Sequence, residues 1–195
     1  MEVKGTVLQT MRLFIPKRHS RSEYELWLSK LSPEVRLIYK MGPTKTNWYP
    51  VNEYLVEPTR IYCSLFHGGD RRGAREAGRF SAEHSLRDAY NLFVNPHSVD
   101  FIISRVAKIM PMYYRPSAAE VVESTDGLVR VRITDPIRID EIIEHRIAGW
   151  LERALELHNC NGVSVDIHLS ATKGDPYTEF LLSWSTENEE GRECG

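Results

Sequence analysis

The feature that most constrains the fold of this chain is a change in its hydrophobic period near residue 118. The stretch "VRVRIT" alternates apolar and polar side chains, and Asp126-Gly127 separates it from the run "AEVVEST". Alternation with a period of two is typical of a half-buried strand, and Asp-Gly between two such runs is typical of a tight hairpin. We therefore expect two antiparallel strands joined by a type I′ turn, in which Gly127 needs a positive φ.

An amphipathic helix and two more strands are predicted after this hairpin. The helix ends at Asn161-Gly162, and its apolar side chains recur at helical spacing: Ile139, Ile142, Ile143, Ile147, Trp150, Leu151, Ala154 and Leu155. The stretches "GVSVDIHLS" and "YTEFLLSWS" alternate again, and the residues between them, "ATKGDP", have the composition of a turn. Residues 118–185 therefore predict a ββαββ unit, an antiparallel sheet with its helix on one side.

Residues 1–117 are predicted to be mostly helical. The exception is "VKGTVLQTMRLFIP", whose content of Val, Leu, Ile and Thr predicts one or two strands that stop at Pro16. Helices are expected over 22–31 with Ser22 as N-cap, after Trp48-Tyr49-Pro50, after Asp70, and over 99–110. We expect an α+β fold in a single domain over 1–185 and a flexible acidic tail over 186–195.

Charge and composition exclude several classes of protein. The net charge of −2 gives no general attraction to nucleic acid or membranes, and no apolar run approaches the roughly 20 residues of a membrane span. Three dispersed cysteines argue against a disulfide framework, and the first residues lack the pattern of a signal peptide. These features predict a cytoplasmic protein.

Four motifs carry a resemblance to known proteins: "KGTVLQ", "WYP", "GDRRGAREAGRFSAEHSLRDAY" and "GVSVDIHLSATKGDPYTEFLLSW". In this order they resemble an uncharacterised family of paralogous bacterial proteins that is abundant in myxobacteria, over residues 3–185. The C-terminal half is also similar to the superfamily of haem nitric-oxide-binding domains, 4-vinyl-reductase-type domains and vesicle-tethering subunits. That resemblance implies a helical N-terminal half packed on a four-stranded antiparallel sheet, an apolar cavity between them, and frequent dimers.

Aromatic side chains are the main candidates for a binding site. Those on the elements that the superfamily packs around its cavity are Trp48, Tyr49, Tyr90, Phe93, Phe101, Tyr113, Tyr114 and Trp150. Two interpretations stay open, because such residues either fill a core or line a pocket for a small apolar molecule. We place the pocket hypothesis between the helices of 71–112 and the ββαββ unit, for a ligand with at most one polar group.

A second candidate is a basic stripe formed by Arg71, Arg72, Arg75 and Arg79 at the start of a helix. Such a stripe can hold an anion or an acidic partner. It can equally be a solvated helix face that Glu76 and Glu83 partly neutralise. No basic-aromatic platform accompanies it, so we expect no nucleic-acid binding.

Catalytic and metal motifs are missing from the sequence. "HGGD" lacks the Gly-x-Ser-x-Gly elbow of esterases, and His158 and Cys160 have no second ligand pair at zinc spacing. We therefore expect no metal, no cofactor and no enzyme, but a ligand-binding, sensory or regulatory domain with a protein partner or a second copy as partner. The alternatives are a protein-interaction adaptor whose cavity is filled by side chains, and a haem-based gas sensor.

The resemblance makes haem a specific question. In the haem-binding relatives a histidine precedes a Pro-x4-Pro segment, and a Tyr-x-Ser-x-Arg motif holds the haem carboxylates. Pro111 and Pro116 match the prolines, but Ile103 occupies the ligand position and His97 lies two turns earlier. Where the carboxylate-binding motif is expected, the chain has "VRVRITD".

We therefore predict that the protein binds no stoichiometric haem. Reconstitution with haem, followed by absorption spectroscopy, should give no defined shift of the Soret band, because both the axial ligand and the carboxylate-binding motif are replaced. A one-to-one ferrous complex that is lost in the His97→Ala variant would contradict this prediction.

Overall fold

The computed structural model describes residues 1–90, 108–135 and 139–185, with the backbone alone at 87–90 and 135. The N-terminal half contains β1 (Glu2–Lys4), α1 (Gly5–Arg18), α2 (Arg21–Lys30), α3 (Pro33–Met41), β2 (Trp48–Pro50), a π-helical turn η1 (Asn52–Val56), α4 (Glu57–His67) and α5 (Arg72–Tyr90). After a helical segment at 108–113 follow β3 (Tyr114–Arg115), β4 (Ala118–Thr125), β5 (Leu128–Asp135), α7 (Glu141–Leu157), β6 (Asn161–Leu169), the 3₁₀ turn η2 (Ala171–Lys173) and β7 (Thr178–Ser185).

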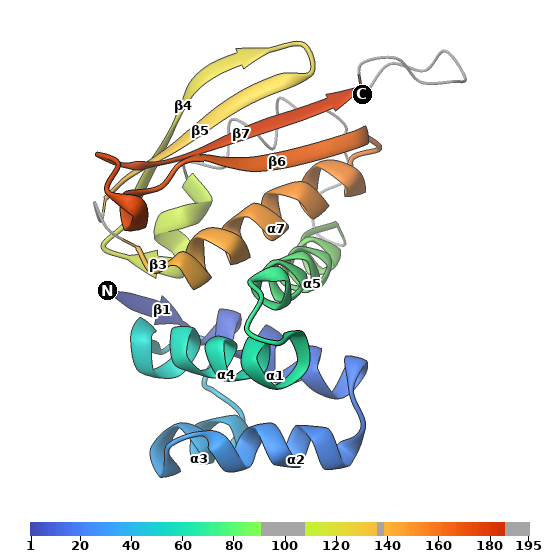
Figure 1. Ribbon diagram of the computed structural model, residues 1–195, viewed down its shortest axis with the longest axis vertical. Helices are drawn as coiled ribbons and strands as arrows, with labels where there is room; N and C mark the ends of the chain where they lie inside the picture. Colours follow the sequence, from blue (N-terminus) through green and yellow to red (C-terminus); the bar gives the residue numbers. More distant parts are fainter. Residues whose placement is uncertain (91–107, 136–138, 186–195) are drawn as a thin grey trace.

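The C-terminal half is the predicted ββαββ unit. Its four strands form an antiparallel sheet in the order β4-β5-β7-β6, and α7 runs along one face of that sheet (Figure 1). The register pairs Val131 with Phe180 and Ile167 with Phe180, so apolar side chains of three strands meet on the face toward α7. The α+β fold class is confirmed.

The hairpin turn differs from its prediction in one detail. Gly127 has φ +75°, as expected, but Asn159 is the only non-glycine residue with positive φ in the described ranges. Asp126 therefore lacks the positive φ that a type I′ turn requires at both central positions. The turn needs one left-handed residue rather than two, and glycine supplies it without steric cost.

The prediction of strands at the N-terminus is wrong beyond the first few residues. Only Glu2–Lys4 form a strand, which lies between β2 and β3, and Gly5–Arg18 form α1. The buried side chains of α1 include Leu8, Met11, Phe14 and Ile15, whose spacing of three and four residues is helical. Burial of this stripe outweighs the strand preference of the β-branched residues, and Pro16 is accommodated inside the helix near its end.

The following helices also begin at positions other than the predicted ones. Ser20, rather than Ser22, is the N-cap of α2, and it forms a capping box with Glu23. Helix α3, which was not predicted, begins with Ser32 as its N-cap. Pro58 lies within a continuous helical stretch over 51–67, directly after the π-helical turn η1, so the predicted helix is regular α-helix only from Glu57 onward.

Helices α5 and α7 cross at two glycines. A Cβ atom on Gly78 of α5 would lie 2.0 Å from the backbone oxygen of Arg146, and one on Gly149 of α7 would lie 2.0 Å from that of Arg75. Each helix therefore approaches the backbone of the other where a side chain is missing. The pair lies between the sheet and the helices α1 and α4 (Figure 1).

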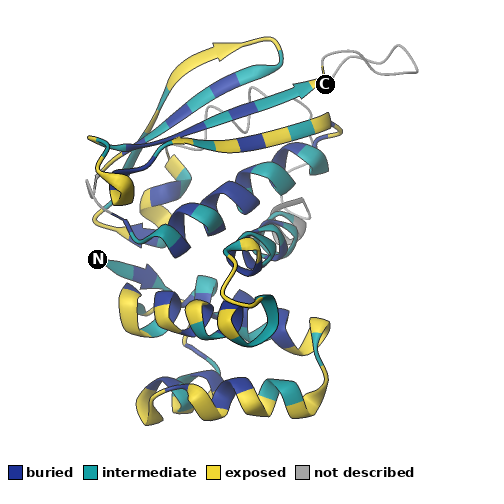
Figure 2. Cartoon of the chain, in the orientation of Figure 1, coloured by how far each residue is buried: buried dark blue, intermediate teal, exposed yellow. Residues whose placement is uncertain are grey.

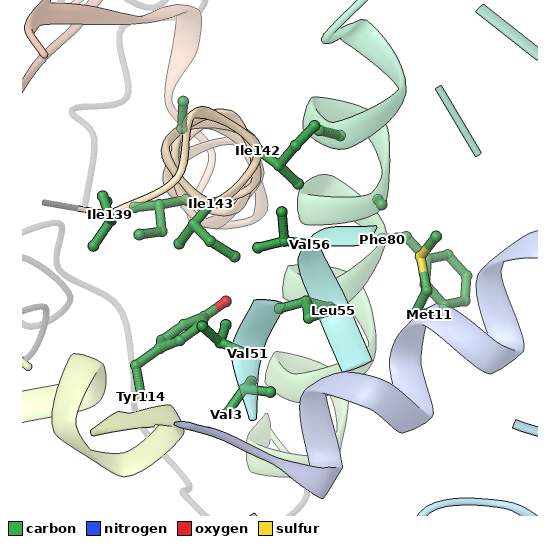
Figure 3. Packing of buried hydrophobic residues seen from close by; sticks show 14 of the residues in the cluster. Val3, Met11, Val51, Leu55, Val56, Phe80, Tyr114, Ile139, Ile142 and Ile143 are labelled. Atoms are coloured by element: carbon green, nitrogen blue, oxygen red, sulfur yellow. The ribbon is translucent and has the colours of Figure 1, made fainter. Parts of the chain in front are cut away.

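The core is continuous through these layers. Buried residues lie mainly on the surfaces that face neighbouring layers, while exposed residues dominate the outer sides of α2 and α3 (Figure 2). Met11 of α1, Leu55 and Val56 of η1, and Ile142 and Ile143 of α7 belong to one hydrophobic cluster (Figure 3). No helix within the described ranges has both the length and the apolar character needed to cross a membrane.

The turn geometry predicts that Gly127→Val destabilises the fold by about 1–2 kcal/mol, because a β-branched residue is strained at positive φ. Urea unfolding followed by circular dichroism measures the change. Asp126→Ala, at the neighbouring position of the same turn, serves as the control. Equal midpoints for Gly127→Val and the parent chain would show that the turn tolerates a side chain.

The helix crossing predicts that Gly78→Ala lowers the free energy of unfolding by about 1–3 kcal/mol, because the new methyl group collides with backbone rather than with a movable side chain. In Gly73→Ala, on the same helix, the methyl group would meet side-chain atoms of His67 and Cys63 at 2.7 and 3.0 Å. We expect this control to lose less stability in the same urea titration. If the two variants lose the same amount, close contact at the backbone is not the constraint.

Candidate functional site

A cavity of about 230 Å³ lies between the helical half and the ββαββ unit. Its walls come from α1, α5, the helical segment 108–113, β5 and α7. Its apolar lining consists mainly of Val7, Ile109, Met110, Ala119, Val131, Ile133, Ile147, Leu151 and Phe180. The void lies in the region where the sequence placed the pocket hypothesis.

Three of the eight aromatic candidates line this cavity: Tyr113, Tyr114 and Trp150. Tyr114 is buried, and Figure 3 shows it below Ile143 and beside Val51. Trp48 and Tyr49 belong to β2 and are not among the lining residues, and Arg115 stacks on the Trp48 ring at 4.2 Å. The side chain of Tyr90 and the residues Phe93 and Phe101 lie outside the described part of the chain, as do His97 and Ile103.

The four arginines of the basic stripe all have carboxylate partners. Arg71 contacts Glu141 at 2.9 Å, and Arg72 contacts Asp70 at 3.0 Å. Arg75 donates to Glu152 at 2.9 Å, and Arg79 to Glu156 at 2.7 Å.

The stripe is therefore neutralised mainly by α7, rather than by Glu76 and Glu83 as predicted. Glu83 itself accepts a hydrogen bond from Arg153 of α7. The hydrogen bond to Glu156 raises the pKa of Arg79 and keeps its charge in place. This geometry favours a structural role for the stripe, which joins α5 to α7.

The most unusual lining residue is Arg146 of α7, which the sequence analysis did not single out. Its side chain is 2% exposed. Its Nη1 donates to Met11 Sδ at 3.5 Å and to Thr59 Oγ1 at 3.4 Å, and its Nη2 donates to Ser81 Oγ at 3.5 Å. None of these acceptors carries a charge.

The pattern of the sequence contains a signal for Arg146. The residue lies four positions after Ile142 and four before Trp150, within the apolar stripe of the helix. A cation on the buried face of an amphipathic helix departs from the usual division into apolar and charged faces.

The other polar groups that line the cavity are the exposed Lys45, the half-buried Gln9 and His84, and several hydroxyls. Thr6 Oγ1 is buried and has no hydrogen-bond partner in the described part of the chain. Ser81 Oγ and Thr10 Oγ1 are 2.7 Å apart, and Trp150 Nε1 donates to Ser85 Oγ at 3.4 Å. Burial raises the pKa of Tyr114, while the charge of Arg146 and a hydrogen bond with it act in the opposite direction.

A buried carboxylate lies elsewhere on α7 and is not part of this lining. Glu144 accepts hydrogen bonds from Thr178 at 2.6 Å, from Ser170 at 2.8 Å and from Thr172 at 3.3 Å. These hydroxyls fasten α7 to the connection between β6 and β7. The segment "TKGDPY" is thus a structural turn, as predicted, with Gly174 at φ +104°.

A metal centre has no support within the described ranges, where no three side chains of His, Cys, Asp or Glu are grouped to hold an ion. Cys63 is buried, and desolvation raises the pKa of its thiol. A thiol with a raised pKa is a poor nucleophile at neutral pH.

No protein-family model and no curated protein matches this chain. The resemblance to a myxobacterial family therefore has no support from sequence comparison.

Solved structures that share the fold are H-NOX proteins. An H-NOX variant from S. oneidensis in the Fe(II) state has a TM-score of 0.73 at 11% identity, with 95% of this chain and 98% of that chain covered. A variant from K. algicida in the Fe(II) unliganded state has a TM-score of 0.71 at 11% identity, with 97% and 100% covered. A structure from work on haem distortion in the H-NOX family has a TM-score of 0.70 at 12% identity, with 97% and 99% covered. The chain has the H-NOX fold.

Among the described residues, those of β5, where the carboxylate-binding motif was expected, do not fit haem carboxylates. Val129, Val131 and Ile133 are buried on the inner face of β5, where the haem carboxylates would need polar partners. Arg130 and Arg132 lie on alternate positions of the same strand and bind the Glu179 carboxylate at 3.2 and 3.0 Å.

Proposed function

We propose that this chain is a ligand-binding domain with a sensory or regulatory role, whose ligand is a small organic molecule held in the cavity between the helical half and the ββαββ unit. The observation that carries this proposal is the void of about 230 Å³, lined from both halves of the fold. Protein interiors are packed as densely as organic crystals and contain few voids larger than one water molecule. An engineered apolar cavity of about 150 Å³ already binds benzene.

The lining favours binding over catalysis. Ser81 and Ser85 donate to backbone oxygens of Ala77 and Ser81, and Thr10 donates to Val7. Within the described ranges, these hydroxyls form no hydrogen bond with a carboxylate or an imidazole, although the His84 ring also lines the cavity. A nucleophilic hydroxyl needs such a base within reach.

Haem-based gas sensing is the alternative, and the likeness to solved structures favours it over a haem-free ligand-binding domain. The solved neighbours are H-NOX proteins in Fe(II) and NO-ligated states. The apolar inner face of β5 argues against haem in this chain, and the spectroscopic reconstitution described above separates the two candidates. A protein-interaction adaptor would need the cavity to be filled by the chain's own side chains.

We expect that native mass spectrometry of the protein, purified from the cells that naturally make it, detects a retained small molecule. In Val131→Phe the added ring occupies the cavity, so the retained mass should be lost while near-ultraviolet circular dichroism shows a folded protein. Val122→Phe, on an exposed position of β4, is the matched control and should keep the molecule. A clean apo mass for the parent chain, with no haem uptake, would favour the adaptor instead.

A further inference from the structure

Within the described part of the chain, Arg146 differs from its neighbours on α5 and α7 in having no carboxylate partner. Arg75, Arg79 and Arg153 hold carboxylates at 2.7–2.9 Å, and all three are partly exposed. Arg146 is 2% exposed, and it contacts the thioether of Met11 and the hydroxyls of Thr59 and Ser81 at 3.4–3.5 Å, with a further hydrogen bond to Tyr114; all of these groups are neutral. The deepest arginine is therefore the least compensated one within the described ranges.

Such an arrangement is costly in an empty protein. A guanidinium keeps its charge under all ordinary conditions and presents five donors. Charge-assisted hydrogen bonds are about 2.7–2.9 Å long, so contacts of 3.4–3.5 Å to neutral atoms replace little of the lost hydration. Buried charges are otherwise found paired.

Two further observations favour the cavity over the described protein around it as the place of an anion for Arg146. Arg146 itself lines the void, and so does Thr6, whose hydroxyl is buried without a hydrogen-bond partner in the described part of the chain. The buried carboxylate of Glu144 accepts from three hydroxyls of the β6–β7 connection. The Glu144 carboxylate is therefore already hydrogen-bonded and is not the partner of Arg146.

We infer that the ligand of the cavity is a small apolar acid whose carboxylate pairs with Arg146. This inference rests on the proposed function and adds the chemical class of the ligand. One buried cation matches one negative charge, and the planar guanidinium fits a carboxylate through two parallel hydrogen bonds. The apolar side chains from β5, β7 and α7 then cover the hydrocarbon part of the molecule.

The probes for a test are two acids and their uncharged amides: phenylacetate with phenylacetamide, and hexanoate with hexanamide. Each pair keeps nearly the same shape and differs in charge. Calorimetric titration of the full chain should show each acid binding at least about tenfold more tightly than its amide, because the carboxylate forms charge-assisted hydrogen bonds with a buried guanidinium. Haem is titrated in parallel.

Three variants assign the effect to Arg146. Arg146→Met should abolish the preference for the acids and leave the affinity for the amides within about twofold, while Arg146→Lys should keep part of the preference. Arg153→Met, on the same helix, removes an arginine that has its own carboxylates and should change neither affinity. Without ligand, the melting temperature of Arg146→Met should equal or exceed that of the parent chain, because an uncompensated charge is replaced by an apolar group.

Each of the other possible results contradicts the inference and leads to a different conclusion. Equal affinities of the parent chain for acids and amides would contradict the pairing of a ligand carboxylate with Arg146, but not the binding of a small molecule in the cavity. If none of the four probes binds, the proposal that the cavity holds a small organic molecule is contradicted as well. A lower melting temperature of Arg146→Met with an unchanged acid preference would mean that Arg146 holds a carboxylate of the chain itself. A one-to-one haem complex lost in Arg146→Met would assign the carboxylate to haem rather than to a small acid.

Discussion

Helices α5 and α7 can approach each other closely because each presents a glycine where the other presents a backbone carbonyl. Gly78 meets Arg146 and Gly149 meets Arg75, so the two contacts are reciprocal across one crossing point. The two contacts fix how far α5 and α7 are shifted along each other. They therefore also fix where the Arg146 side chain lies in the interior. The ion pairs of Arg75 with Glu152 and of Arg79 with Glu156 then follow on the outer side of the same crossing.

The crossing also explains why a void survives beside it. Where the helices touch at glycine, large side chains have no room, and the nearby positions of α5 are the small residues Ser81 and Ser85. The sheet closes the other side with Val131, Ile133 and Phe180, which alternate inward along β5 and β7. Two elements with different periodicities, a helix and a sheet, thus share one boundary that neither can fill completely.

The C-terminal half could be predicted from the sequence because its signals are local. The alternation in "VRVRIT", the glycine at 127 and the apolar stripe of α7 each specify one element without reference to the rest of the chain. The N-terminal helix α1 could not be predicted in the same way. Its first residues are strand-forming types, and only packing of Leu8, Met11 and Phe14 against the later core decides for a helix.

The candidate site follows the same division. The general position of the cavity and three aromatic residues of its wall were predicted, since they depend on the order of elements. The carboxylates that neutralise Arg71, Arg75 and Arg79 lie about 70 or more residues away in sequence, so no local pattern connects them with the stripe. The sequence shows Arg146 as a charged residue within an apolar stripe. Its lack of a carboxylate partner in the described part of the chain depends on which side chains surround it, and the sequence does not show this.

A buried cation with no carboxylate partner among the described residues affects how long the protein persists in the cell. A ligand that binds only the folded chain adds about 2.7 kcal/mol of stability at a hundred times its dissociation constant. An empty chain with the buried charge of Arg146 visits unfolded forms more often than a loaded one, and cellular proteases act on those forms. The amount of this protein in the cell would then rise and fall with the concentration of its ligand, because the ligand-bound chain is degraded more slowly than the unbound chain.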